Sequence, residues 1–377
     1  MTTHDGNRAA PLILALALAA GAAPAALAGD FYQQRNLVSD GFMAAANNDP
    51  HLINAWGLAF NPFGAVWVAD NGTGLSSLYD GAGKPQALLV QIPAPAGAGG
   101  HGAPTGTVFN ASTGFVVTSG GVSGPSRFIF ATEDGVIAGW APAVDGSHAI
   151  RAVDNSASSG AVYKGLALGA GGSGALLYAT DFHNNKIDVF DQAFKPVPLA
   201  LGAFSDPALP LGYAPFGIQA INGDLYVSYA RQDGAKHDDV KGKGLGFLDV
   251  FDPNGRLIRR LVSRGDLNAP WGMALAPAGF GKFGNRLLVG NFGDGMINAY
   301  DLVTGQFAGR LKAADRRPLR IDGLWGLAFG NGFLSQPVDT LYFAAGPGDE
   351  QHGLYGRIDA LPGDDHDDLS GTEGGDD

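Results

Sequence analysis

The stretch Ala55-Trp56-Gly57-Leu58-Ala59-Phe60 is the first of six related phrases along the chain of 377 residues. The later phrases keep a central glycine within a short run, at Gly106, Gly165, Gly217, Gly272 and Gly326. Successive glycines lie 49, 59, 52, 55 and 54 residues apart. A repeat of about this length is typical of solenoids and propellers, and the segments between the phrases decide between these folds.

Most of each repeat consists of short runs that are typical of β-strands. After the first phrase, residues 66–70, 75–80 and 87–92 are rich in aliphatic and aromatic side chains and are separated by turn residues. The same order recurs at residues 176–191. No segment of the mature chain shows helical periodicity over three turns. Six repeats of four strands therefore predict an all-β, six-bladed β-propeller over residues 29–362.

The last repeat supplies only three strands, at residues 325–329, 340–344 and 354–358. We predict that the missing strand is Arg35-Asn36-Leu37-Val38-Ser39, which precedes the first phrase. Such a closure joins the two ends of the ring and removes open sheet edges. The alternative is that residues 30–40 form a loose arm.

The first 28 residues are predicted to form a signal peptide. Arg8 precedes an apolar run at residues 11–20, and Ala26-Leu27-Ala28 has the small-x-small pattern of a cleavage site. The apolar run is too short to span a membrane, and no later segment is long enough. We therefore expect a secreted or periplasmic mature protein. An N-terminal membrane anchor is the alternative.

Composition and charge exclude several classes of function. The net charge is −12, and seven acidic residues of the tail at 363–377 leave −5 for the rest. This acidic tail has almost no apolar residues, so we expect it to be disordered. No basic stripe is present, so we expect no nucleic-acid partner. The absence of cysteine excludes thiol catalysis, zinc–thiolate sites and iron–sulfur clusters. We expect a monomer.

Strand alternation brings most of the polar loops to one face of the predicted ring. The loops that lead into the inner strands share this face with the loops between second and third strands. We expect the ligand site there, at one mouth of the central channel. The predicted ligand-binding face consists of Asn54, Asp70, Asn71, Asp134, Asp181, His183, Asn268, Asn291, Asp294 and Asp322. The alternative is that these acids and amides only stabilise turns.

Catalytic and metal-binding candidates come from the same face. His101 and His183 do not recur in every repeat, so they are the candidate catalytic residues. Hard cations such as Ca²⁺ prefer carboxylate and amide oxygens. The candidate ligands for Ca²⁺ or another divalent cation are Asp70, Asp181, Asn291 and Asp294. No EF-hand or His-Glu-x-x-His motif supports a metal more specifically.

Two further features bear on this face. Trp56, Trp271 and Trp325 occupy one register, and we expect them to pack between neighbouring blades. The charged segment at residues 231–246 interrupts the fourth repeat and could cover the channel mouth as a lid. A simple exposed loop is the alternative. Its glycines lack the Gly-Lys-Ser/Thr ending of a phosphate-binding loop.

The glycine phrases and the strand runs that follow them resemble NHL-type six-bladed propellers over residues 30–361. Residues 36–40 and 52–59 resemble, more narrowly, an uncharacterised family of secreted bacterial propeller proteins. This resemblance implies the fold but no activity.

Two neighbouring propeller classes do have activities. Gluconolactonase-like and paraoxonase-like lactonases hold calcium on the axis, but their Glu-Gly-Pro motif is replaced here by Asn54-Ala55-Trp56-Gly57. Streptogramin lyase-like propellers use a histidine and a metal, and the sequence around His183 does not match their pattern.

The sequence therefore favours a binding or interaction module whose partner is an unidentified small molecule, glycan or protein. One alternative is a metal-dependent lactonase or lyase, in which a cation acts as Lewis acid and His183 or His101 as general base. A structural surface or matrix protein is the other alternative.

Overall fold

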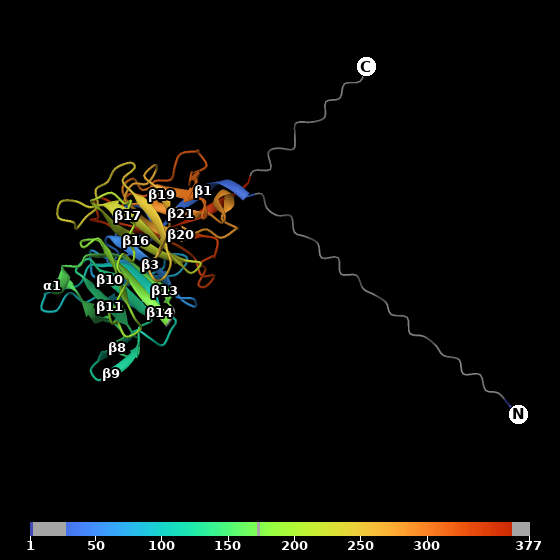
Figure 1. The fold of residues 1–377 in the computed structure, drawn as a ribbon. Helices are drawn as coiled ribbons and strands as arrows, with labels where there is room; N and C mark the ends of the chain where they lie inside the picture. Colours follow the sequence, from blue (N-terminus) through green and yellow to red (C-terminus); the bar gives the residue numbers. More distant parts are fainter. Residues whose placement is uncertain (3–27, 172–173, 364–377) are drawn as a thin grey trace, which may run out of the picture.

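The computed structural model describes residues 1–2, 28–171 and 174–363. The predicted signal peptide at 1–28 and the acidic tail at 363–377 lie almost wholly outside the described residues. Between them the strands form six sheets around a central axis, called blades 1 to 6 in chain order (Figure 1).

The first three blades hold eleven of the strands. Blade 1 contains β3 (Ala55–Phe60), β4 (Val66–Asp70), β5 (Leu75–Tyr79) and β6 (Val90–Gln91). Blade 2 contains β7 (Pro104–Phe109), β10 (Phe128–Thr132), β11 (Val136–Trp140) and β12 (Ile150–Asp154). Blade 3 contains β13 (Tyr163–Gly171), β14 (Gly174–Asp181) and β15 (Lys186–Phe190).

The remaining blades follow in the same order around the ring. Blade 4 contains β16 (Tyr213–Ile221), β17 (Asp224–Arg231), β18 (Phe247–Phe251) and β19 (Leu257–Ser263). Blade 5 contains β20 (Pro270–Leu275), β21 (Leu287–Asn291), β22 (Ile297–Tyr300) and β23 (Phe307–Arg310). Blade 6 contains β24 (Leu324–Phe329), β25 (Leu341–Ala345), β26 (Leu354–Pro362) and β1 (Ala28–Ser39), with β2 (Asn47–Asn48) beside β1. The predicted all-β, six-bladed propeller is confirmed.

Glycine allows the inner strands to approach one another closely. These strands contact each other in the order β3, β7, β13, β16, β20, β24 and again β3, which closes the ring. A Cβ atom added at Gly217 would lie 2.1 Å from the carbonyl oxygen of Trp271, and one at Gly326 would lie 2.4 Å from that of Trp56. The glycines at the centre of the six repeated phrases, here called the phrase glycines, all lie similarly close to the backbone of the next blade. A larger residue would force the blades apart.

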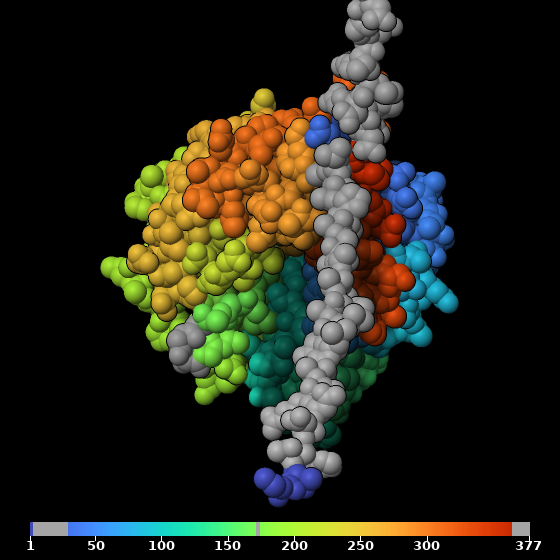
Figure 2. All heavy atoms as spheres, turned by 90° about the vertical axis from the view of Figure 1, so that its right-hand side faces the viewer, coloured from blue at the N-terminus to red at the C-terminus, as the bar shows by residue number. Residues whose placement is uncertain are grey.

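The N-terminal strand closes the ring as predicted. β1 pairs antiparallel with β26, with Arg35 opposite Arg357 and Ser39 opposite Leu354. Tyr32 anchors β1, because its buried hydroxyl donates to the Phe280 carbonyl at 3.2 Å and accepts from the Phe283 amide at 3.1 Å. In Figure 2 the red C-terminal segment accordingly lies beside the blue N-terminal one.

Two local features depart from a uniform repeat. Blade 3 has three strands, and the bridge between Phe190 and Pro196 stands in place of a fourth. Pro196 and Pro198 explain this difference, because proline has no N–H to donate to a strand ladder. In blade 2 a hairpin of β8 (Val116–Ser119) and β9 (Val122–Pro125) is inserted between β7 and β10.

The described residues contain two short helices, α1 (Ser156–Ser159) and η1 (Gly281–Phe283). Neither is long and apolar enough to cross a membrane. The hydrophobic clusters lie chiefly between neighbouring blades. One of them packs Trp67 of blade 1 against Phe128 and Phe130 of blade 2. Packing of this kind makes the channel mouth a rigid frame for the loops above it.

Candidate functional site

The residue before each phrase glycine defines one level of the central channel. These six equivalent, buried residues are Trp56, Thr105, Lys164, Phe216, Trp271 and Trp325. Trp325 stacks on Trp56 at a centroid distance of 3.4 Å, and Trp271 meets both rings edge-on at 5.7 Å. The three tryptophans therefore pack on one another in the channel, and Trp56 and Trp271 meet although blade 6 separates their blades. The two contacts of Trp325 join neighbouring blades, as expected, whereas the contact between Trp56 and Trp271 does not.

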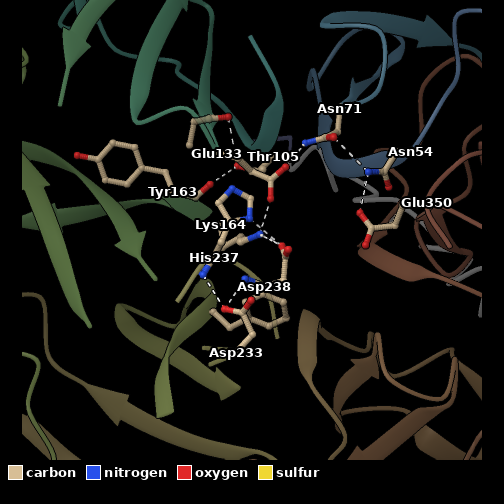
Figure 3. A network of polar contacts seen from close by, with 12 residues as sticks. Asn54, Asn71, Thr105, Glu133, Tyr163, Lys164, Asp233, His237, Asp238 and Glu350 are labelled. Carbon is tan, nitrogen blue, oxygen red and sulfur yellow. Dashed lines mark hydrogen bonds and ion pairs between the residues drawn. The ribbon is translucent and has the colours of Figure 1, made fainter. Parts of the chain in front are cut away.

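Lys164 is the charged residue at this level (Figure 3). It is 1% exposed, and its Nζ donates to a carboxylate oxygen of Glu133 and, at 3.3 Å, to Oδ1 of Asp238. Nζ also lies 5.1 Å from the ring centroid of Trp56. Burial alone would lower the pKa of Lys164, but Glu133 and Asp238 raise it above its ordinary value. Lys164 is therefore a buried ammonium ion at neutral pH.

A chain of amide and carboxylate groups extends this ion pair around the mouth. Asn71 Nδ2 donates to Glu133 Oε2 at 2.8 Å. Asn54 Nδ2 donates to Asn71 Oδ1 at 3.1 Å and to Glu350 Oε2 at 2.8 Å. Burial raises the pKa of Glu350, and the hydrogen bond from Asn54 opposes that rise. Together with Lys164 and Asp238, these residues form what we call the Lys164 network (Figure 3).

The lid segment, residues 232–246 between β17 and β18, lies over this mouth. Asp238 reaches Lys164 of blade 3. Lys241 Nζ lies 4.3 Å from the ring centroid of Phe292 in blade 5. The Gly242 amide donates to Asn268 Oδ1 at 2.6 Å, also next to blade 5. The structure thus places the charged insertion of blade 4 across the channel, from blade 3 to blade 5.

Several buried polar atoms at the mouth have no hydrogen-bond partner among the described residues. They are Nε1 of Trp56, Trp271 and Trp325, Oδ1 of Asn54 and Oδ2 of Asp239. Burial raises the pKa of Asp239 to about 7, although Lys164 and Lys241 oppose the rise. A buried polar atom without a partner costs about 1–3 kcal/mol. Eighteen such atoms occur among the described residues, and the five at this mouth can bond to water or to another polar molecule.

Glu133, His237 and Asp238 could together hold a cation. Their ligand atoms lie within 4.8 Å of one another, in the part of the chain that the structure describes. However, the Lys164 ammonium already contacts both carboxylates. The hydrogen bond that the His237 ring donates to Asp238 raises the pKa of His237, which favours imidazolium over a neutral metal ligand. A divalent cation would have to displace both positive charges.

The predicted ligand-binding face is divided by the structure into two groups. Asn54 and Asn71 belong to the Lys164 network. Most of the others form hydrogen bonds with the backbone of neighbouring loops. Asp134 Oδ2 accepts from the Ala103 amide at 2.7 Å, and Asp322 Oδ2 accepts from the Gly348 amide at 2.9 Å. Asn268 holds the lid segment through the Gly242 amide.

The four candidate metal ligands lie in three different blades. Asp70 in blade 1 is fully buried, which raises its pKa, and its Oδ2 accepts from the Ser77 amide at 2.9 Å. Asp181 in blade 3 accepts from Val162 at 3.3 Å. Asn291 and Asp294 bond to each other in blade 5 at 3.1 Å. Each thus bonds within its own blade, and their assignment as a Ca²⁺ site stays a prediction.

The two candidate histidines lie outside the Lys164 network. His101 is exposed, and its Nδ1 lies 3.2 Å from the neighbouring carbonyl of Gly102. His183 is half-buried, and only its backbone carbonyl is bonded, by Gln232 at 3.4 Å, within the described ranges. Their catalytic role stays a prediction.

The central residues of the network, Lys164 and Glu133, were not selected as site residues from the sequence. One signal could have identified Lys164. It stands at the position where Trp56, Phe216, Trp271 and Trp325 place an aromatic ring in other blades. A lysine at this buried position of the repeat needs an acidic partner. The acids of nearby loops are therefore the residues to consider as that partner.

Sequence comparison identifies relatives of the chain. It is 35% identical over 314 residues to uncharacterised protein R648 of Acanthamoeba polyphaga mimivirus, covering 80% of this chain and 76% of that protein. It is 35% identical over 327 residues to uncharacterised protein L690 of the same virus, covering 85% and 84%. The chain belongs to the family of these proteins. No protein-family model matches it. Because these relatives are viral, they do not support the narrower resemblance to secreted bacterial propellers.

Solved structures with this fold include enzymes of several kinds. A streptogramin B lyase is 13% identical, with a TM-score of 0.50 over 88% of this chain and 98% of the lyase. The PQQ-bound aldose sugar dehydrogenase of Streptomyces coelicolor is 14% identical, with a TM-score of 0.51 over 89% of this chain and all of that enzyme (100%). At such identities the likeness concerns the fold alone.

Proposed function

We propose that this protein is a binding module that takes a small, neutral, polyhydroxylated molecule at the mouth of its channel. The observation that carries this proposal is the set of buried, unpartnered polar atoms at Trp56, Trp271, Trp325, Asn54 and Asp239. Indole N–H groups need acceptors, and the amide and carboxyl oxygens accept hydrogen bonds. A molecule with several hydroxyl groups supplies both kinds of partner.

The mixed charge of the mouth favours a neutral ligand. A cationic ligand would meet the ammonium groups of Lys164 and Lys241, and an anionic one would meet Glu133, Glu350 and Asp238. A neutral polyol or saccharide avoids both repulsions and can bond to carboxylate, amide and ammonium groups. The aromatic faces of Trp56 and Phe292 add apolar contact, but Lys164 and Lys241 now lie over them.

Binding in this account requires the lid segment to move. Asp238 is well exposed, so solvent reaches the outer side of the ion pair with Lys164. The contact of Lys241 with Phe292 closes the other side of the mouth. Rupture of the Lys164–Asp238 ion pair, the cation–π contact and the hydrogen bond from the Gly242 amide to Asn268 costs about 1 kcal/mol each, which a ligand with several hydrogen bonds can offset.

The second candidate is a divalent-metal-dependent hydrolase or lyase, favoured by the grouping of Glu133, His237 and Asp238. In that function the cation would polarise a carbonyl oxygen. The position of Lys164 between two of the ligands makes this the weaker candidate. Metal analysis of protein purified without chelators separates the two, because only the enzyme needs a bound cation. A structural surface or matrix protein stays an untested alternative.

Saturation-transfer NMR with a panel of neutral mono- and disaccharides and linear polyols tests the proposal. The proteins are the wild type, Lys164→Met and the control Lys195→Met, an exposed position on the opposite side of blade 3. We expect transfer to at least one compound in the wild type and the control, and an affinity at least tenfold lower in Lys164→Met. Absence of transfer to every compound in the folded wild type would overturn the proposal.

A further inference from the structure

A cleft of about 570 Å³ lies between blades 1 and 2, on the face opposite the Lys164 network. The residues that form its wall lie at or next to the ends of strands on that face. Phe63 follows β3, Leu78 is the last residue but one of β5, Arg127 precedes β10 and Trp140 ends β11. The volume falls in the range typical of small-molecule sites.

The floor of the cleft is a rigid group of aromatic rings. Trp67 stacks on Phe128 with a centroid distance of 3.9 Å and meets Trp140 at 4.7 Å. Phe109 adds an edge-on contact to Phe128 at 5.4 Å. Trp67, Phe128 and Trp140 are almost fully buried and Phe109 is partly buried, whereas Phe63 at the rim is 81% exposed. An exposed phenylalanine beside an aromatic hollow favours a ligand with a flat apolar body.

Arg127 is the charged residue among those that line the cleft. Its NH1 group donates to the Ser112 carbonyl at 3.4 Å. Within residues 28–171 and 174–363, no carboxylate lies at ion-pair distance from Arg127. Most of the guanidinium donors are therefore available to a ligand. A guanidinium binds a carboxylate or sulfonate through two parallel hydrogen bonds.

We infer that this cleft is a second binding site, whose ligand is a small amphipathic anion with an aromatic ring and a carboxylate or sulfonate group. The ring lies on the floor of Trp67, Phe128 and Trp140, between this floor and Phe63. The anionic group pairs with Arg127. This inference is independent of the function proposed for the channel mouth, because the two sites share no residue.

Naphthalene-2-carboxylate is the probe, and naphthalene-2-carboxamide is its neutral counterpart. Binding is followed in ¹H–¹⁵N spectra through the indole signals of Trp67 and Trp140, which are assigned with tryptophan-to-phenylalanine variants. The proteins are the wild type, Arg127→Gln, Arg127→Lys and the control Arg317→Gln, whose side chain is exposed in a loop after blade 5. Thermal melting verifies that each variant is folded.

We expect the carboxylate to shift the signals of Trp67 and Trp140 in the wild type and the control. Arg127→Gln should weaken carboxylate binding about tenfold and leave amide binding unchanged, and Arg127→Lys should lie between. Equal loss for both compounds, or no loss for either, would overturn the role of Arg127. No shift of either tryptophan at millimolar carboxylate would overturn the site itself.

Discussion

Lys164 and Asp238 lie 3.3 Å apart, Nζ to Oδ1, and this contact joins the inner strand of blade 3 to the lid segment of blade 4. The two partners differ greatly in their surroundings. The lysine side chain is 2% exposed and that of Asp238 is 66% exposed. The lysine is therefore a fixed part of the channel, whereas Asp238 can leave it for water. In the proposed binding function, the mouth opens on the side of the lid while the blades stay in place.

Replacement of the two partners should have unequal effects on stability. Lys164→Met leaves the mostly buried Glu133 without its cation, so we expect a loss of about 2–4 kcal/mol in the free energy of unfolding. Asp238→Asn removes only an exposed partner and should cost less than about 1 kcal/mol. Urea unfolding measures both. Equal losses would show that the lid, and not the channel, holds the lysine in place.

The pKa of Asp239 predicts how stability depends on pH. In the folded protein, burial raises this pKa to about 7, with Lys164 and Lys241 opposing the rise. Between about pH 4 and 7 the unfolded chain therefore binds fewer protons at this residue than the folded one, and the free energy of unfolding falls as pH rises. Above pH 7 the decline from this residue ends.

Asp239→Asn removes this decline and tests its origin. Relative to the wild type, the variant should gain stability as pH is raised from 5 to 7.5, measured by urea unfolding at each pH. Asp249 should keep part of the decline in both proteins, because burial and Asp206 raise its pKa to about 7 while Arg260 opposes. The control Asp315→Asn, at an exposed loop residue, should follow the wild type. A pH-independent difference between Asp239→Asn and the wild type would contradict the assignment.

Closure of the ring by β1 can be tested at one residue. Tyr32→Ala removes a buried ring and two hydrogen bonds to the segment around η1, so the free energy of unfolding should fall by about 3–5 kcal/mol. Arg35→Ala on the same strand is the control, because its side chain is half exposed and its ion pair with Asp359 is long, at 3.6 Å. We expect it to cost less than about 1 kcal/mol. Thermal or urea unfolding that finds the two variants alike would mean that β1 contributes little to the ring.

The phrase glycines should tolerate no side chain. In Gly217→Ala the new Cβ would lie 2.1 Å from the Trp271 carbonyl oxygen, so blades 4 and 5 must separate. We expect a loss of about 2–4 kcal/mol or failure to fold. Gly146→Ala is the control, because nothing lies within 4 Å of its added Cβ and its φ is not positive. It should stay within about 0.5 kcal/mol of the wild type.

The fold could be predicted because its determinants are local and repeated. The steric requirement at Gly57 and its five equivalents gives a period, and β-branched and aromatic runs fill each period. Even the closing strand could be located, since blade 6 lacked one. The fourth strand of blade 3 is absent because Pro196 and Pro198 interrupt the ladder, and strand counting alone did not anticipate this.

The site was only partly predictable, because it is assembled from distant loops. Strand alternation placed Asn54 and Asn71 on the face where the Lys164 network lies. It could not show that Asn54 bonds to Glu350, which is 296 residues away. Nor could it separate acids that hold turns, such as Asp134, from Glu133 beside it, which faces Lys164. The side chains of adjacent loop residues point in different directions. Which of them reaches the channel depends on the folded backbone of the loop.

The central claim is that the channel mouth binds a neutral polyhydroxylated molecule through its buried tryptophans. The indole ¹H–¹⁵N signals test it most directly, since the chain has 5 tryptophans, three in the channel and two in the cleft between blades 1 and 2. Titration with the panel compound that gives the strongest saturation transfer should shift Trp56, Trp271 and Trp325, while Trp67 and Trp140 stay unchanged. In Lys164→Met the same shifts should need at least tenfold more compound. Unchanged signals of all three channel tryptophans at saturating compound would contradict the account.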